Sequence, residues 1–313
     1  MLMAACSVPL ALACGSKYGS EPTSDARAPD DGTAPPTDSD SDGARSDAGD
    51  GSVARCDPTK PFATPTPAAG LNSDAGERFL HVLPGETAGM FTSYRDGIGK
   101  LYYAPREPDA GAFGPVSLLF ATSTNVSNGF LYAENLELVY ATQVTDGGGA
   151  YITRRPSAAS VFPDGLPISG LPVDLTVYNP YVTRGGLAFW FAQAAPDRDL
   201  YVATRASLSA PFGPPARIAE LATSADDLIP VVRADEREIF FTSMRSGPRL
   251  PYHATRNSVT DTWSPPTVVE ELVMGDNPVD VTWVSDDGCV IAVQRLNDAM
   301  PPVANVYVAT RGR

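Results

Sequence analysis

The sequence is poor in the residue types that most often carry chemistry. Histidine occurs only twice, as His81 and His253, and none of the four cysteines belongs to a Cys-x-x-Cys pair. Two histidines so far apart argue against a histidine-rich metal site and against a histidine-dependent catalytic triad. We therefore expect no metal site and no cofactor. Residue types alone identify no catalytic residue.

Basic residues are also scarce, and no segment concentrates them. The chain has 23 lysines and arginines against 37 aspartates and glutamates, which gives a net charge of −14. Proteins that bind nucleic acids gather Lys and Arg on one face, so the composition excludes this class. Amphipathic helical patterns are absent too, while 43% apolar residues suffice for a substantial core. We expect an all-β protein and a monomer.

What the chain does have is a repeat of about fifty residues. A tyrosine followed four residues later by an arginine recurs five times, and successive tyrosines lie 49, 50, 51 and 55 residues apart. An aromatic anchor falls eleven residues after each of the first four tyrosines. The tyrosines are Tyr102, Tyr151, Tyr201, Tyr252 and Tyr307, the arginines are Arg106, Arg155, Arg205, Arg256 and Arg311, and the anchors are Phe113, Phe162, Phe212 and Trp263.

Each unit has the composition of four short strands separated by turns that contain Gly and Pro. A strongly apolar segment such as residues 239–243 precedes the tyrosine strand, and a segment such as residues 216–221 ends the unit. Four short strands repeated at this period predict the blades of a β-propeller. Five tyrosine motifs predict five four-stranded blades in residues 56–313.

The fifth unit stops at Arg313, before its anchor and its fourth strand. Residues 61–71 match residues 211–221 of a complete unit, and Phe62 precedes Phe113 by 51 residues, which continues the period. We therefore predict that this amino-terminal segment supplies the missing strand of the last blade. Such closure ties the ends of the domain together and leaves no gap in the ring of sheets.

The first fourteen residues are uncharged and either small or apolar, too few to span a bilayer but suited to a secretory signal. Residues 10–16, Leu-Ala-Leu-Ala-Cys-Gly-Ser, resemble a bacterial lipobox, which implies that Cys14 carries a lipid. Ala11 stands where the lipobox favours leucine, so simple secretion and the absence of export stay open, and Cys6 is a second candidate. Since Gly15 rather than aspartate follows Cys14, the resemblance implies an outer-membrane lipoprotein that faces the periplasm or the cell surface.

Residues 15–55 consist mostly of Asp, Ser, Gly, Ala, Pro and Thr, with no aromatic residue after Tyr18. Such a segment buries too little apolar surface to offset its ordering entropy, so we predict a disordered acidic linker. The chain would then divide into a signal segment at 1–14, the linker at 15–55 and the propeller at 56–313. Only the lipid would contact a membrane.

The apolar strands that end in Thr-Ser, the Asp-Asp-Gly turn at 286–288 and the Leu-Tyr-Val-Ala-Thr-Arg strand at 200–205 resemble TolB-type, WD-like β-propeller repeats of bacterial envelope proteins. Within that group the chain is most similar to secreted or lipid-anchored propeller proteins of myxobacteria, over residues 57–313. The resemblance implies a propeller at the cell envelope. It implies no catalytic residues, because this family shares an architecture and not a chemistry.

The repeated tyrosines and arginines invite a functional interpretation, such as a ring of guanidinium groups around a channel. A packing role explains them better, because every blade faces the same packing problem. Residues four apart on a strand point to the same face, where the arginine stem can cover an aromatic ring. His253 takes the position of Val202 and Val308 in other units, which indicates a substitution within a repeat rather than a ligand.

Two classes of function remain. The first is a non-catalytic binding or scaffold module whose loops or channel hold a protein or carbohydrate partner. The second is a five-bladed glycosidase, which needs two or three carboxylates that converge in the channel. Asp174, Asp227 and Asp280 precede the first strands of three units at a spacing of 53 residues, which is typical of a repeated turn position rather than of catalytic acids. We therefore favour the binding module.

The remaining two cysteines predict a disulfide between Cys56 and Cys289. On the repeat register Cys56 corresponds to Ala206, just after the tyrosine strand, and Cys289 opens the preceding strand of the last blade. In an antiparallel pair the start of one strand lies beside the end of the next, so the two thiols should meet where the ring closes. An exported protein reaches a compartment in which such bonds persist.

Overall fold

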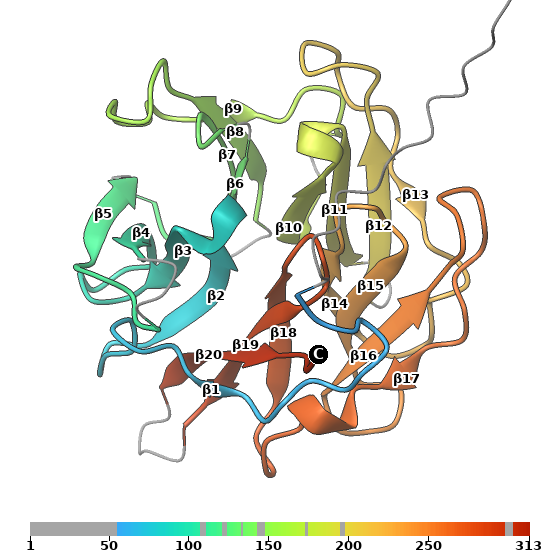
Figure 1. Cartoon of the computed structure of the whole chain (residues 1–313). Coiled ribbons are helices and arrows are strands. Elements are labelled where there is room, and N and C mark those ends of the chain that lie inside the picture. The colour runs from blue at the N-terminus through green and yellow to red at the C-terminus, as the bar shows by residue number, and fades with distance from the viewer. Residues whose placement is uncertain are drawn as a thin grey trace, which may run out of the picture. The chain divides into compact units, whose positions relative to one another are not determined.

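The computed structural model describes residues 55–106, 111–120, 124–132, 134–142, 148–172, 175–194, 198–297 and 303–313. These residues form five antiparallel four-stranded sheets, arranged as blades around a central axis (Figure 1). The fold is therefore the predicted five-bladed β-propeller. The signal segment with Cys14 and Cys6, and the linker apart from Arg55, lie outside the described residues.

Blades are numbered along the chain, and their strands are given from the innermost outwards. Blade 1 holds β2 (Glu77–Val82), β3 (Ala88–Ser93), β4 (Lys100–Pro105) and β5 (Ser117–Phe120). Blade 2 holds β6 (Val126–Tyr132), β7 (Glu137–Thr142), β8 (Ala150–Arg154) and β9 (Leu166–Pro167). Blade 3 holds β10 (Val177–Thr183), β11 (Ala188–Ala194), β12 (Arg198–Thr204) and β13 (Ala216–Arg217). Blade 4 holds β14 (Asp227–Val232), β15 (Glu238–Ser243), β16 (Leu250–Thr255) and β17 (Thr267–Val268). Blade 5 holds β18 (Val279–Val284), β19 (Val290–Leu296), β20 (Ala304–Thr310) and β1 (Thr66–Pro67).

Helical structure in the described part of the chain consists of three short 3-10 turns. They are η1 (Pro84–Glu86), η2 (Arg184–Gly186) and η3 (Glu270–Leu272). η1 and η2 each connect the first strand of a blade to the second. Within these residues no helix has the length and apolarity needed to cross a membrane.

The amino-terminal strand closes the ring as predicted. β1 pairs antiparallel with β20, with Thr66 opposite Val308, and Phe62 forms a further bridge with Arg311. β1 itself is only two residues long, shorter than the predicted segment 61–71. The outer strands β9, β13 and β17 are equally short. Short outer strands present few unpaired backbone groups to other chains.

The core lies between neighbouring blades and is richest along their second strands. β3, β7 and β15 are buried at every position, because both faces of each strand are covered. Phe91, Phe191 and Phe241 are completely inaccessible to solvent. This explains why residues 239–243 form a continuous apolar run rather than an alternating pattern.

The recurring arginine packs on the aromatic anchor of its own blade. In all five blades the guanidinium carbon lies between 4.2 and 5.3 Å from the centroid of the anchor ring. Arg311 covers Phe62, the anchor that the amino-terminal segment supplies. Four of the five tyrosines stack instead on an aromatic residue of the second strand, and Tyr307 is the exception. Both motif residues therefore have structural contacts.

Candidate functional site

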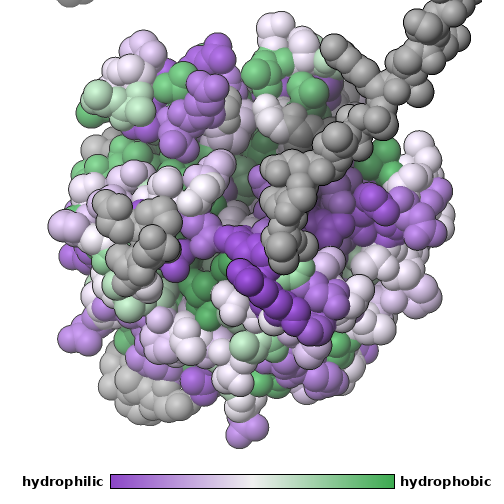
Figure 2. Space-filling model, viewed as in Figure 1, coloured by the Kyte–Doolittle hydropathy of each residue, from purple (hydrophilic) through white to green (hydrophobic). Residues whose placement is uncertain are grey.

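The propeller has a cavity at each end of its inner strands β2, β6, β10, β14 and β18. A cavity of about 510 Å³ lies where these strands end, and we name it the aromatic opening. A second cavity of about 280 Å³ lies where the inner strands begin, and we name it the arginine opening. Hydrophilic side chains gather around the middle of the face shown in Figure 2, with hydrophobic ones visible between them.

Four aromatic rings from four blades form the base of the aromatic opening. His81 stacks on Phe130 with ring centroids 3.9 Å apart, and Phe130 meets Tyr181 edge to face at 4.4 Å. The Trp283 ring lies 6.4 Å from His81. Each of these side chains is at most 8% exposed. This aromatic cluster gives the cavity an apolar base.

His81 belongs to this cluster as a neutral ring. Burial lowers the pKa of His81 from 6.5 to about 3, because the surroundings disfavour the charged imidazolium. Its Nδ1 accepts a hydrogen bond from the backbone N–H of Leu131 at 3.5 Å. His81 therefore contributes aromatic surface rather than a proton donor near neutral pH.

The aromatic cluster was not among the sequence predictions. Its members occupy one register position of the inner strands, and Val231 occupies it in blade 4. In chain order the five positions lie 49, 51, 50 and 52 residues apart. An aromatic residue at one repeat position in four of five units is the signal that could have identified them. The valine and the change of residue type from blade to blade concealed it.

Charged residues border the aromatic opening at the seam between blades 5 and 1. Arg55 donates from Nε to Oδ2 of Asp287 at 2.9 Å and from Nη2 to Oδ1 at 3.0 Å. It also contacts Glu86, whose carboxylate accepts a hydrogen bond from Arg106 Nη1 at 3.1 Å. These contacts neutralise two of the carboxylates that line the cavity.

Two further carboxylates, Asp286 and Glu134, line the same cavity without such neutralisation. Neither forms an ion pair with another described residue. Burial, and then the negative charge of Asp287, raise the pKa of Asp286. Burial, and then the charge of Asp286, raise the pKa of Tyr181. Asp286 therefore lies close enough to the aromatic cluster to influence it electrostatically.

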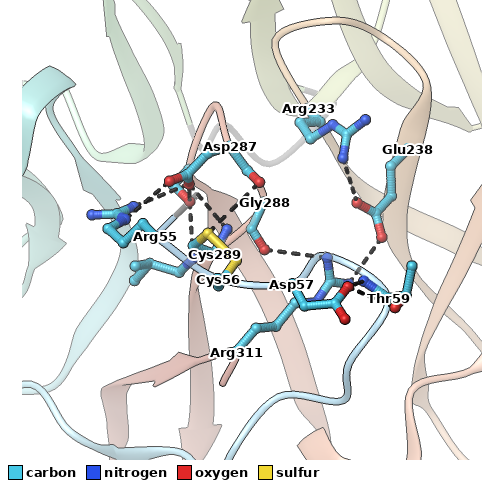
Figure 3. The surroundings of a disulfide bond; sticks show 12 residues. Arg55, Cys56, Asp57, Thr59, Arg233, Glu238, Asp287, Gly288, Cys289 and Arg311 are labelled. Carbon is cyan, nitrogen blue, oxygen red and sulfur yellow. Dashed lines mark hydrogen bonds and ion pairs between the residues drawn. A yellow bond between two sulfur atoms is a disulfide. The ribbon is translucent and has the colours of Figure 1, made fainter. Parts of the chain in front are cut away.

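The disulfide expected at the ring closure lies directly beside this border (Figure 3). Cys56 and Cys289 are bonded, and their Cα atoms are 5.6 Å apart. The backbone N–H of Cys289 donates to Asp287 Oδ1 at 3.0 Å, and Arg55 immediately precedes Cys56. Both partners of the Arg55–Asp287 ion pair are thus held next to the covalent link between the amino-terminal segment and blade 5.

The arginine opening has the opposite polarity. Three arginines line it, and Asp280 is the one carboxylate among its described lining residues. Oδ1 of Asp280 accepts hydrogen bonds from Arg249 Nε at 2.9 Å and from Thr242 Oγ1 at 3.1 Å, and Oδ2 accepts one from Gln294 Nε2 at 2.9 Å. Gln294 Oε1 in turn accepts a hydrogen bond from the backbone N–H of Phe79. The network joins blades 4, 5 and 1. The arginines are Arg78, Arg249 and Arg295.

A β-bulge separates the residues that line the two openings in four of the inner strands, β2, β10, β14 and β18. Phe79, Asn179 and Ile229 have left-handed φ angles of 53°, 52° and 54°, and all three line the arginine opening. Each lies two residues before the position of the aromatic cluster. Since a bulge redirects the side chains beside it, the same strand supplies residues to both openings.

Of the three candidate carboxylates, the structure describes Asp227 and Asp280, and of these two only Asp280 lines one of the openings. Asp174 lies outside the described residues. Asp227 is completely buried and pairs with Arg245 at 2.8 Å, as Glu77 in blade 1 pairs with Arg95 at 3.1 Å. Asp227 is therefore part of a structural ion pair at the start of an inner strand.

The expectation that Asp227 and Asp280 share a repeat position was wrong. Asp227 lies opposite Ser243. Ser243 comes two residues after Phe241, which lies opposite the motif tyrosine Tyr252. The equivalent position in blade 5 is Val279, and Asp280 follows it. Because side chains alternate along a strand, this shift by one residue places Asp280 on the opposite face.

His253 occupies the expected repeat position. It lies opposite Phe240, as Val202 lies opposite Trp190 in blade 3. Its Nδ1 is 3.8 Å from Glu238. Across the described part of the chain, no group of three His, Cys, Asp or Glu side chains has an arrangement that could hold a metal ion.

Comparison with known proteins identifies the fold and no family. No family model and no curated protein matches the sequence. An endo-arabinase from Bacteroides thetaiotaomicron is 14% identical, with 78% of this chain and 96% of that chain covered and a TM-score of 0.51. A family 117 glycoside hydrolase from Zobellia galactanivorans is 8% identical, with coverage of 80% and 90% and a TM-score of 0.52. TolB from Acinetobacter baumannii is 12% identical, with coverage of 76% and 55% and a TM-score of 0.46. Identities this low show a shared propeller fold alone.

Proposed function

We propose that this chain is a non-catalytic binding module of the bacterial envelope, of the TolB-type, WD-like kind, and that its aromatic opening binds a carbohydrate. The observation that supports this proposal is one concave cavity with an aromatic base and carboxylates along its border. A volume of about 510 Å³ suits a small ligand. Sugars offer apolar C–H faces to aromatic rings and hydroxyl groups to carboxylates.

A carbohydrate fits this cavity better than a protein partner does. Protein partners typically bind to broad exposed apolar patches of several hundred square ångströms. The aromatic cluster here is concave and almost entirely shielded from solvent, so only a ligand that enters the cavity reaches it.

Binding to a glycan array, followed by calorimetry with the retained glycan, tests this proposal. We expect Trp283→Phe and Asp286→Asn each to weaken binding about tenfold, or ~1.4 kcal/mol. His253→Val is the matched control, because it restores the residue of other repeats outside the cavity. Retention of no glycan by the wild-type protein, or equal binding by all variants, would contradict the proposal.

The envelope location depends on the lipobox. We propose that Cys14 carries the lipid and that residues 15–55 act as a coil with a root-mean-square reach of about 35 Å, which holds the propeller clear of the membrane. Replacing Cys14 by Ser should move the protein from the membrane fraction to the soluble fraction, whereas Cys6→Ser should leave it in place. If the Cys14 variant stays in the membrane fraction, Cys14 is not the anchor.

One observation favours the alternative, a glycosidase. The pKa of Asp286 is raised while that of Asp287 is lowered, and a pair of carboxylates with opposite shifts can divide the roles of acid and base. Against it, Asp287 is fully engaged by Arg55, Ser285 and the N–H of Cys289. Hydrolysis of a polysaccharide that Asp286→Asn abolishes would establish the enzyme and refute the non-catalytic module.

A further inference from the structure

The charge of the aromatic opening narrows the class of sugar. Four carboxylates line the cavity, and Arg55 is the one described cationic residue among its lining residues. His81 adds no positive charge near neutral pH, because its pKa is about 3. The described lining is therefore negative by three charges when all four carboxylates are ionised. The carboxylates belong to Glu86, Glu134, Asp286 and Asp287.

The four carboxylates are not equivalent. Glu86 and Asp287 share Arg55, and Glu86 also binds Arg106. Asp286 and Glu134 have no cationic partner among the described residues. They come from different blades, since Glu134 lies between β6 and β7 and Asp286 follows β18. Both residues are exposed at the rim of the cavity, where a ligand can meet two carboxylates that pair with no described cation.

The base of the cavity adds to this preference. Aromatic rings attract cations through the negative potential of their faces. The Tyr181 and Trp283 rings come from blades 3 and 5, and both line the cavity together with Asp286. An aromatic base beneath unpaired carboxylates favours a ligand that combines an apolar face with a positive charge.

We propose that the aromatic opening binds an ammonium-bearing sugar, in which protonated amines meet Asp286 and Glu134 while the sugar rings pack on the aromatic cluster. This inference rests on the carbohydrate-binding function proposed above and adds the charge of the ligand. A neutral sugar would leave both carboxylates without a counter-charge.

The proposal implies a defined dependence on pH. Burial and the charge of Asp287 raise the pKa of Asp286, and a bound ammonium would lower it again. Affinity should therefore rise as pH increases through the titration of Asp286, and fall once the amine of the ligand loses its proton. The charged and titratable groups around Asp286 include Asp287 in its own turn, Tyr181 on β10, Glu134 before β7, Glu86 in η1, Arg55 before Cys56, and Arg233, which follows β14 and lies beside Gly288.

Chitosan and chitin oligosaccharides of equal length provide the test, because they differ in an amine against an acetamido group. Calorimetry on the full chain at mildly acidic pH and low salt should show at least tenfold tighter binding of the amine form. Asp286→Asn with Glu134→Gln should remove this preference, whereas Asp96→Asn should keep it, since Asp96 is a half-exposed carboxylate of the β3–β4 turn. High salt should reduce the preference as well.

The outcomes separate this inference from the proposed function. Equal binding of the two oligosaccharides, or tighter binding of the acetylated one, refutes the ammonium preference and leaves carbohydrate binding intact. A preference that survives in the double variant also refutes it, because other groups would then carry the charge. Absence of binding to any glycan refutes the proposed function and this inference together.

Discussion

The two openings of the propeller share four inner strands, β2, β10, β14 and β18, in their described linings and carry opposite charge. Among the described lining residues, the aromatic opening has four carboxylates and one arginine, whereas the arginine opening has three arginines and one carboxylate. The two also differ in how they are held. A disulfide fixes the border of the first, and a hydrogen-bonded network around Asp280 joins three blades at the second.

The difference shows where a repeat protein keeps its individual chemistry. Each motif arginine contacts the aromatic anchor of its own blade, and this contact is alike in all five blades. The residues at the two openings differ from blade to blade. Convergence of five inner strands on one axis brings such dissimilar residues together, so each opening is a combination that no single blade contains.

The largest effect should follow from breaking the covalent link at the aromatic opening. The double variant Cys56→Ser, Cys289→Ser should lower the free energy of unfolding by about 2–5 kcal/mol, because the bond closes a loop of 233 residues. Urea denaturation measures this change. The wild-type protein in reductant should match the variant, and a variant as stable as the oxidised protein would show that the bond contributes nothing.

Substitution by asparagine should affect the stability of the fold differently at two aspartates, one at each opening. Asp280→Asn should destabilise the fold by about 2–3 kcal/mol, below the full value for a buried pair because Arg249 is one-third exposed. Asp286→Asn should not destabilise it at neutral pH, because the pKa of Asp286 is raised in the folded state. A raised carboxyl pKa means that stability increases as pH falls through that pKa, and this increase should vanish in the asparagine variant.

Thermal denaturation of both aspartate variants as a function of pH tests this contrast. Loss of stability in Asp286→Asn equal to that in Asp280→Asn would mean that Asp286 has a cationic partner in the folded protein. An undisturbed Asp280→Asn variant would mean that the network does not hold blades 4, 5 and 1 together.

The effect that is smallest near neutral pH comes from the titration of His81. The pKa of His81 is lowered to about 3 in the folded state, so the unfolded chain binds an extra proton between about pH 6.5 and pH 3. Stability should therefore decrease as pH falls through this window, by up to about 1.4 kcal/mol per pH unit, and His81→Phe should reduce that slope. Equal slopes for the wild-type protein and His81→Phe would show that His81 is accessible to protons in the folded state.

The repeat by itself determined the architecture. Tyrosine, arginine and anchor recur because each blade must bury the same interface, so their spacing counts the blades. Phe62 continues the period from the amino-terminal end, and Arg311 covers it in the structure as the other arginines cover their anchors. The repeat also predicted the disulfide, because its register places both Cys56 and Cys289 where the ring closes.

Only the tertiary structure decided which residues of different blades meet at the site. His81 and Phe130 are 49 residues apart in sequence and stack at 3.9 Å only because their strands meet at the axis. Asp280 and Asp227 occupy register positions that differ by one residue. The spacing along the chain does not reveal this difference, whereas the strand pairing does. Local patterns record the contacts that every unit repeats. The contacts that give each opening its charge join residues from different units, and these depend on the geometry of the closed ring.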